Sequence, residues 1–157
     1  MNLRTNSQKG FTIVELLIVI VVIAILAAIS IVAFTGIQQR ARDTQRAADA
    51  KTVLDAVSAY NADKGQWPSS STTPATFATE TRTALGTFTT VKVATELLAA
   101  TGTGNRITSE APSSSNKNYI QITPRLTGTA PNQTVAGANI TYWSEETNGT
   151  KTITAGS

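Results

Sequence analysis

The stretch from Phe11 to Phe34, FTIVELLIVIVVIAILAAISIVAF, decides the architecture of this chain. Glu15 is its only ionisable residue, and neither Pro nor Gly interrupts it. At about 1.5 Å per residue, a helix of this length extends roughly 36 Å, which exceeds the roughly 30 Å of a bilayer's hydrocarbon core. In lipid the backbone must satisfy its own hydrogen bonds, so a single span is helical. The stretch therefore predicts a membrane helix.

The ten residues before this stretch, MNLRTNSQKG, are polar and basic. Arg4 and Lys9 place that short end in the cytoplasm and the rest of the chain outside. A cleaved secretory signal has an apolar run of about 7–15 residues followed by a small-residue cleavage site. Here the run is longer and continues past every alanine that resembles such a site. A plain signal anchor fits the length and the charge but gives no reason for Glu15.

Glu15 is the informative residue, because a carboxylate at the bilayer centre costs about 2.5–3.5 kcal/mol. One account places it near the cytoplasmic interface, where the N-terminus of a helix favours an anion. The account that we favour gives Glu15 a positive partner that appears only when subunits meet. Cutting the chain after Gly10 creates such a group, the α-amine of Phe11, one helical turn from Glu15. The amine of a neighbouring subunit also sets the axial stagger between the two chains.

The string Lys9-Gly10-Phe11-Thr12-Ile13-Val14-Glu15-Leu16 resembles the class III signal of type IV prepilins and type II secretion pseudopilins. The resemblance is close over about the first 35 residues and extends in style along the following helix. In that family a membrane-embedded aspartic peptidase cuts after the Gly and methylates the new N-terminal Phe. The resemblance implies that Lys9 is the leader charge, Gly10 precedes the cut, Phe11 is N-methylated and Glu15 is the assembly carboxylate.

By this resemblance the chain is the precursor of a structural subunit of a type IV pilus. The alternatives are a pseudopilin of a type II secretion or competence system, and a membrane-anchored binding protein that does not polymerise. The implied partners are identical or related pilin subunits in a helical homopolymer, the prepilin peptidase/N-methyltransferase, and an assembly platform with its motor ATPase. The implied location is the cytoplasmic membrane before assembly and an extracellular filament afterwards.

One departure from the family pattern concerns the later part of the apolar stretch. Family members usually carry a helix-breaking Pro near the position of Ser30-Ile31-Val32, and this chain has none there. Its first Gly after the expected cut is Gly36. Any kink is therefore expected near Ser30 or Gly36.

Composition argues against catalysis. The 157 residues include no Cys and no His, which removes thiolate nucleophiles, imidazole bases, disulfides and nearly every transition-metal site. A secreted hydrolase would have to use carboxylate or Ser-Lys chemistry, for which no motif is present. We expect no enzyme activity and no cofactor. Arg4 and Lys9 supply two of the net +3 charges, so the rest of the chain is nearly neutral and DNA binding is not supported.

Beyond the apolar stretch, the pattern predicts one helix of roughly fifty residues. One face is formed by residues that recur at helical spacing: Ala47, Ala50, Leu54, Val57 and either Tyr60 or Asn61. Gly65 ends the helix and Trp67-Pro68 begins an extended segment. The predicted divisions are a cleaved leader at 1–10, a transmembrane helix at 11–34, an amphipathic continuation at 35–64 and an extracytoplasmic head at 65–157.

The head is predicted to contain short helices and a small sheet. Residues 76–85 and 91–100 favour helices, whereas 69–75 and 102–118 favour loops. Strands are expected at 119–126, 139–145 and 151–155, with Thr147-Asn148-Gly149-Thr150 as a hairpin turn and Pro124 at an edge or bulge. The predicted fold is α+β: a long N-terminal helix packed on an antiparallel sheet of three or four strands, the pilin fold.

Two groups of side chains allow more than one interpretation. Arg40, Arg42 and Arg46 suggest contact with DNA or lipid headgroups, but the aspartates among them favour a solvated face or ion pairs between subunits. Trp67 with Tyr142-Trp143 could form a carbohydrate or adhesion patch, although packing is the more common role of such aromatics.

Overall fold

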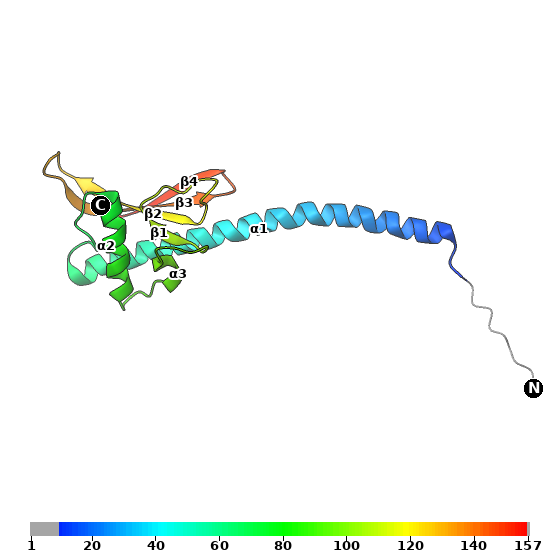
Figure 1. Ribbon diagram of the computed structural model, residues 1–157, viewed down its shortest axis with the longest axis horizontal. Coiled ribbons are helices and arrows are strands. Elements are labelled where there is room, and N and C mark those ends of the chain that lie inside the picture. The colour runs from blue at the N-terminus through cyan, green and yellow to red at the C-terminus, as the bar shows by residue number, and fades with distance from the viewer. Residues whose placement is uncertain (1–9, 157) are drawn as a thin grey trace, which may run out of the picture. The chain divides into compact units, whose positions relative to one another are not determined.

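The computed structural model describes residues 10–156 (Figure 1). The predicted leader charge Lys9, like Arg4, lies outside the described residues. The chain divides into two compact units, Met1–Gln38 and Gln39–Ser157.

Helix α1 (Ile13–Lys64) has 52 residues and confirms the predicted helix of about fifty residues. It continues without interruption through Ser30 and Gly36, where the sequence predicts a kink, and the Ser30 hydroxyl donates to the carbonyl of Leu26 at 2.8 Å. Gly65 ends the helix with φ +69, and its N–H donates to the carbonyl of Asn61 at 2.8 Å. Only glycine adopts this left-handed conformation without strain, as is common just after a helix.

The first unit exposes an apolar surface. Within α1 an 18-residue window has a mean hydropathy of 3.4 and none of it is buried, so this part of the helix is long and apolar enough to cross a membrane. Side chains that would normally be buried, such as Ile18, Ile25 and Val32, are between 56% and 74% exposed. This surface requires lipid or protein around it.

In the second unit, one face of α1 enters the core. Ala50 and Val57 are fully buried, as the helical spacing predicts, while the neighbouring Leu54 is only partly buried. Val53 and Ala56, which the predicted face omitted, are also fully buried. The buried face is therefore centred on Val53 rather than on Leu54.

The sheet has four strands in the order β1-β2-β3-β4: β1 (Arg106–Thr108), β2 (Tyr119–Thr127), β3 (Thr134–Ser144) and β4 (Gly149–Ala155). The last three strands pair antiparallel, but β1 pairs parallel with β2, with Ile107 opposite Ile120. The sheet is mixed, so the prediction that it is antiparallel throughout was wrong. Strand β1 lies within residues 102–118, which were predicted to be a loop, because a three-residue strand with one buried side chain shows no alternation.

The other strands follow the predicted pattern with longer bounds. The β3–β4 hairpin turns at Asn148, whose φ of +47 suits the Asn-Gly pair that predicted it. Pro124 lies on β2 beyond the short β1 pairing, and the register shifts between Arg125 and Leu126. The prediction that Pro124 marks an edge or bulge is confirmed, since a residue without an N–H cannot complete a two-sided ladder.

The short helices differ from prediction at their ends. Helix α2 (Pro74–Thr87) begins earlier than expected, because Pro suits the first helical position, and it continues through Gly86. Helix α3 (Thr95–Leu98) has only four residues, so the predicted helix over 91–100 was wrong in extent. The stiff, β-branched Val91 and Val93 lie outside it, and Val93 reaches the core from non-helical backbone.

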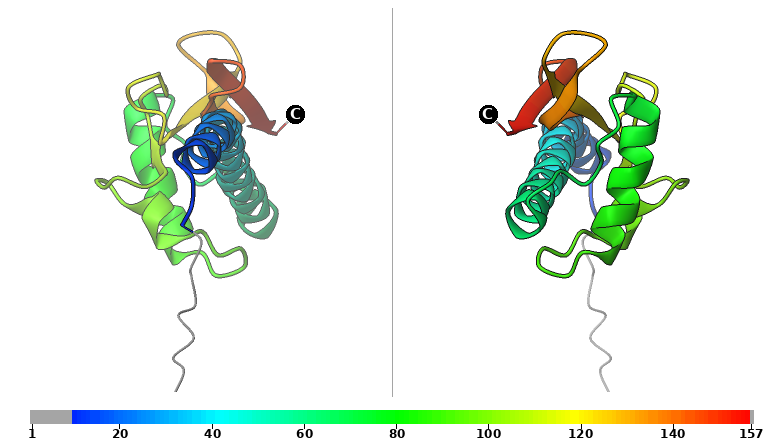
Figure 2. Two further views of the ribbon diagram at one scale, coloured as in Figure 1. Left: turned by 90° about the vertical axis from the view of Figure 1, so that its right-hand side faces the viewer. Right: turned by 90° about the vertical axis from the view of Figure 1, so that its left-hand side faces the viewer.

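One hydrophobic core joins these elements. Figure 2, which looks along α1, shows α2 and the strands gathered around its C-terminal half. Val53 and Val57 of α1 share the core with Phe77 and Leu85 of α2, all at most 2% exposed, and with inward-facing side chains of the sheet. The sheet contributes Ile107, Ile120, Ile122, Ala138, Ile140 and Ala155. Burial of this apolar surface is the main force that holds the head on the helix.

An ion cluster of Arg42, Asp43, Arg46 and Glu145, here named the Glu145 cluster, joins α1 to the β3–β4 turn. Arg42 Nε and Nη2 donate to the two carboxylate oxygens of Glu145 at 3.0 and 2.9 Å. Arg46 Nη1 and Nη2 donate to Glu145 Oε1, both at 3.0 Å. The side chains of Arg46 and Glu145 are only 9% and 7% exposed, so this is a nearly buried pair.

Asp43 completes the cluster by binding the backbone of the turn. Its carboxylate accepts the N–H groups of Glu145 and Glu146 at 2.8 and 2.9 Å and the hydroxyl of Ser144 at 3.0 Å. Arg42 and Arg46 therefore pair with Glu145 of their own chain. The expected solvated face was wrong for Arg46, whose side chain is 9% exposed, whereas Arg42 remains 49% exposed. The contacts join residues about a hundred positions apart, a proximity that helical spacing cannot reveal.

Replacing Glu145 with alanine is expected to destabilise the head by about 2–3 kcal/mol, because the nearly buried Arg46 then keeps only Asp43 as a counter-charge. The measurement is urea unfolding of the full chain in micelles, followed by tryptophan fluorescence, since Trp67 and Trp143 both lie in the second unit. The matched control is Glu146→Ala: Glu146 is 71% exposed, and its removal should change the free energy of unfolding by less than about 0.5 kcal/mol. Equal effects of the two variants would contradict the role of the cluster.

Stability of the head is also expected to fall in acid. The hydrogen bonds from Arg42 are the main reason that the pKa of Glu145 drops from 4.5 to about 2; burial opposes this and Arg46 adds to it. For Asp43, burial alone would raise the pKa, but the N–H groups of Glu145 and Glu146 lower it overall. Both carboxylates bind protons less readily in the folded state, so their contribution is complete above the unfolded pKa. It is lost as the pH falls from about 4.5 toward 2.

Glu145→Gln should flatten this acid dependence, which thermal unfolding at a series of pH values would measure. An unchanged pH profile in that variant would mean that other carboxylates cause the acid sensitivity.

Candidate functional site

The start of α1 is organised by a reciprocal pair of side chains, Thr12 and Glu15. Thr12 precedes the first helical residue, Ile13, and its carbonyl accepts the N–H of Leu16 at 3.3 Å. The N–H and the hydroxyl of Thr12 donate to Glu15 Oε2 at 2.8 and 2.7 Å, and the N–H of Glu15 donates back to the Thr12 hydroxyl oxygen at 3.2 Å. This arrangement is a capping box, in which two unpaired backbone N–H groups are satisfied at once.

The capping box gives Glu15 a partner within its own chain. The partner predicted for Glu15 was the amine of another subunit, and its pairing with Thr12 was not predicted. The signal was present as Thr-x-x-Glu before an apolar run, which is the sequence pattern of a capping box. Both hydrogen bonds to the carboxylate end on Oε2; within residues 10–156 none ends on Oε1. That oxygen has the capacity to accept a further donor.

Gly10 and Phe11 lie ahead of the helix in non-helical backbone. Both are exposed, Phe11 to 86%, and the space around Gly10 where a side chain would stand is empty. The peptide bond between them is therefore accessible and not engaged in helical hydrogen bonding. The Gly10–Phe11 bond, the Thr12 cap and the Glu15 carboxylate therefore all lie within six consecutive residues of the same chain.

The surroundings of Glu15 are apolar. Leu16 and Val19 beside it are more than half exposed, and with Phe11 and Ile18 they line a shallow apolar hollow at the carboxylate. A lone helix offers these side chains nothing to pack against. Covering them with lipid or with other helices would also remove water from Glu15, which strengthens its attraction to any nearby cation.

The remaining candidate groups are placed by packing. Trp143 is 8% exposed, and Trp67 and Tyr142 are partly buried against the core, so the preferred interpretation of these aromatics is confirmed. Arg40 lies on the exposed surface apart from the Glu145 cluster. In the part of the chain that the structure describes, no group of three or more acidic side chains is arranged to hold a metal ion.

Comparison with known proteins identifies the N-terminal region. Residues 5–31 match the family model described as the prokaryotic N-terminal methylation motif. The match covers the expected cleavage and methylation positions, the Thr12–Glu15 box and most of the apolar stretch. Comparison with curated proteins and with solved structures finds no significant match. At residues 5–31 the chain therefore carries the prokaryotic N-terminal methylation motif, the class III signal peptide of type IV pilins and related proteins.

Proposed function

We propose that this protein is the precursor of a type IV pilus subunit, which a prepilin peptidase cuts after Gly10 and methylates at Phe11. The observation that carries the proposal is the methylation motif at residues 5–31, joined to a helix that is apolar and exposed over its first half. The protein has a structural role in this proposal. Energy for moving it out of the membrane comes from a separate motor ATPase and assembly platform.

The exposed apolar half of α1 is surrounded first by lipid and later by protein. In the membrane, lipid covers its side chains and the head is outside the cytoplasm. In the filament, equivalent helices of neighbouring subunits replace the lipid. The hydrophobic effect changes little in this transfer because lipid tails and packed aliphatic side chains are equally apolar. Association therefore depends on close packing and on polar contacts between helices.

Glu15 supplies the polar contact. Before cleavage it caps its own helix through Thr12. Cleavage creates a cationic amine on Phe11, and the free capacity of Oε1 allows Glu15 to accept that amine from a neighbouring subunit while Oε2 keeps the cap. A charge-assisted hydrogen bond in an apolar environment is stronger than the same bond in water. We infer that it sets the axial register of the helices in the filament.

Cleavage is tested by N-terminal sequencing of filaments sheared from cells that express the chain. The expected first residue is N-methylated Phe11, because the Gly10–Phe11 bond is exposed and non-helical. Gly10→Val, which crowds the residue before the cut, should leave a full-length chain in the membrane fraction. Filament protein that begins at Met1, or within the apolar stretch, would contradict the proposed processing.

Glu15 has two roles that can be tested separately: it caps its own helix, and it carries a negative charge. Glu15→Gln retains the capping box, since Gln serves in that position as Glu does, but it removes the negative charge. We expect this variant to be cleaved and inserted in the membrane, with filament yield reduced at least about tenfold by loss of a charge-assisted contact.

The matched control is Thr12→Val, which removes the two capping hydrogen bonds of the hydroxyl but keeps the charge of Glu15 and the backbone N–H bond to it. It should loosen the start of the helix by about 1 kcal/mol yet still form filaments. Electron microscopy and immunoblots of sheared filaments measure both outcomes. Normal filaments from Glu15→Gln would show that the charge has no part in assembly.

A further inference from the structure

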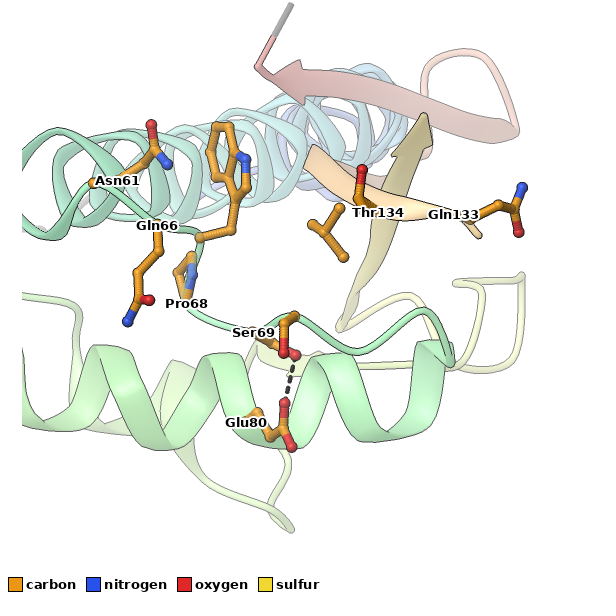
Figure 3. A pocket seen from close by; sticks show the side chains of 11 residues that line it. Asn61, Gln66, Pro68, Ser69, Glu80, Gln133 and Thr134 are labelled. Carbon is orange, nitrogen blue, oxygen red and sulfur yellow. Dashed lines mark hydrogen bonds between the residues drawn. The ribbon is translucent and has the colours of Figure 1, made fainter. Parts of the chain in front are cut away.

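A cavity of about 660 Å³ opens on the head between the end of α1, the segment that follows it and the start of β3 (Figure 3). Asn61 contributes from the helix, residues 65–70 form one wall, Glu80 of α2 lies at the base, and residues 133–135 form the opposite side. The volume is in the range of pockets that hold small molecules. All of these residues belong to the second unit.

The base of the cavity is rigidly held. Ser69 is 4% exposed, and its hydroxyl donates to Glu80 Oε2 at 2.5 Å while accepting the N–H of Ser71 at 3.0 Å. Figure 3 shows the side chains of Ser69 and Glu80 directed toward each other. The buried Ser69 thus orients one carboxylate oxygen of Glu80, while Glu80 as a whole is exposed.

The wall offers an apolar ring beside amide groups. Trp67 is partly buried against the core, and the close approach of Gly156 to its indole leaves no room for a larger residue there. The adjoining Pro68 is buried. Packing holds the indole in place, with its remaining surface available to the cavity. Figure 3 shows Asn61 on one side of the lining and Gln133 on the other, with the Gln133 amide directed away from the other labelled side chains.

The chemistry of this lining selects the ligand class. Side-chain amides and hydroxyls both donate and accept hydrogen bonds, and the Glu80 carboxylate accepts them. Among the residues that line the cavity none is cationic, so an anionic ligand would meet only the negative charge of Glu80. A neutral ligand with many hydroxyls and an apolar C–H face fits the amides, the carboxylate and the indole together.

We propose that this cavity binds a neutral saccharide, with Trp67 covering the apolar face of one sugar ring and Glu80 and Asn61 binding its hydroxyls. The proposal uses only residues of the second unit and does not depend on polymerisation. A head that binds sugar in a chain that never assembles would support this site while overturning the pilus function.

The test is saturation-transfer NMR and tryptophan fluorescence on the full chain in lauryldimethylamine oxide micelles, because that detergent contains no sugar. The probes are glucose, galactose, N-acetylglucosamine and lactose, with N-acetylneuraminic acid as the anionic sugar and ethanolamine as a small cation without a ring. At least one neutral probe should bind, and N-acetylneuraminic acid should bind more weakly than the neutral sugars because of Glu80.

Asn61→Ala and Glu80→Gln should each weaken binding of that probe roughly tenfold, the effect of one lost hydrogen bond to a hydroxyl or of a lost charge. Trp67→Phe should remove most of the fluorescence response. Glu110→Gln, an exposed carboxylate outside the cavity, is the charge-matched control and should bind as the unaltered chain does. The proposal is overturned if no neutral sugar binds, if Asn61→Ala and Glu80→Gln both bind the probe as tightly as the unaltered chain does, or if ethanolamine binds as well as the sugars.

Discussion

A carboxylate at the beginning of an apolar helix must have hydrogen-bond donors. The N-terminal part of this structure depends on that requirement. The reciprocal bonds between Thr12 and Glu15 supply them in the uncut chain. They also define where the helix starts, so the Gly10–Phe11 bond lies outside it. One local motif therefore stabilises a charged residue next to apolar ones and keeps the preceding bond accessible to a peptidase.

The exposure of apolar side chains changes along helix α1. Its first half exposes aliphatic side chains, whereas its second half buries only one face against the head. The Glu145 cluster lies just after the boundary between the two units, where Arg42, Asp43 and Arg46 join the helix to the β3–β4 turn. A head attached only by apolar packing could slide along the helix at little cost. Directional bonds to both the side chain of Glu145 and the backbone of the turn set one register.

The head shows how a small sheet without disulfides becomes stable. A four-stranded sheet needs cover on one face, and α1 and α2 supply it with fully buried aliphatic and aromatic side chains. The segment that leaves α1 at Gly65 crosses to α2 and forms the wall of the polar cavity. Trp67 thus has two surfaces, one packed on the core and one facing the cavity, so its contribution to packing does not preclude ligand binding.

By itself the sequence determined the features that depend on near neighbours: the long apolar helix, its end at Gly65, the Asn148-Gly149 hairpin, and the Gly10, Phe11 and Glu15 motif, which the family match covers. The Thr12 cap could also have been predicted from the sequence, because Thr12 lies three residues before Glu15. Tertiary structure alone decided the parallel pairing of β1, the burial of Glu145 between two arginines and the meeting of Ser69 with Glu80. These contacts join distant segments whose proximity follows from how the whole core packs, and no local periodicity encodes that packing.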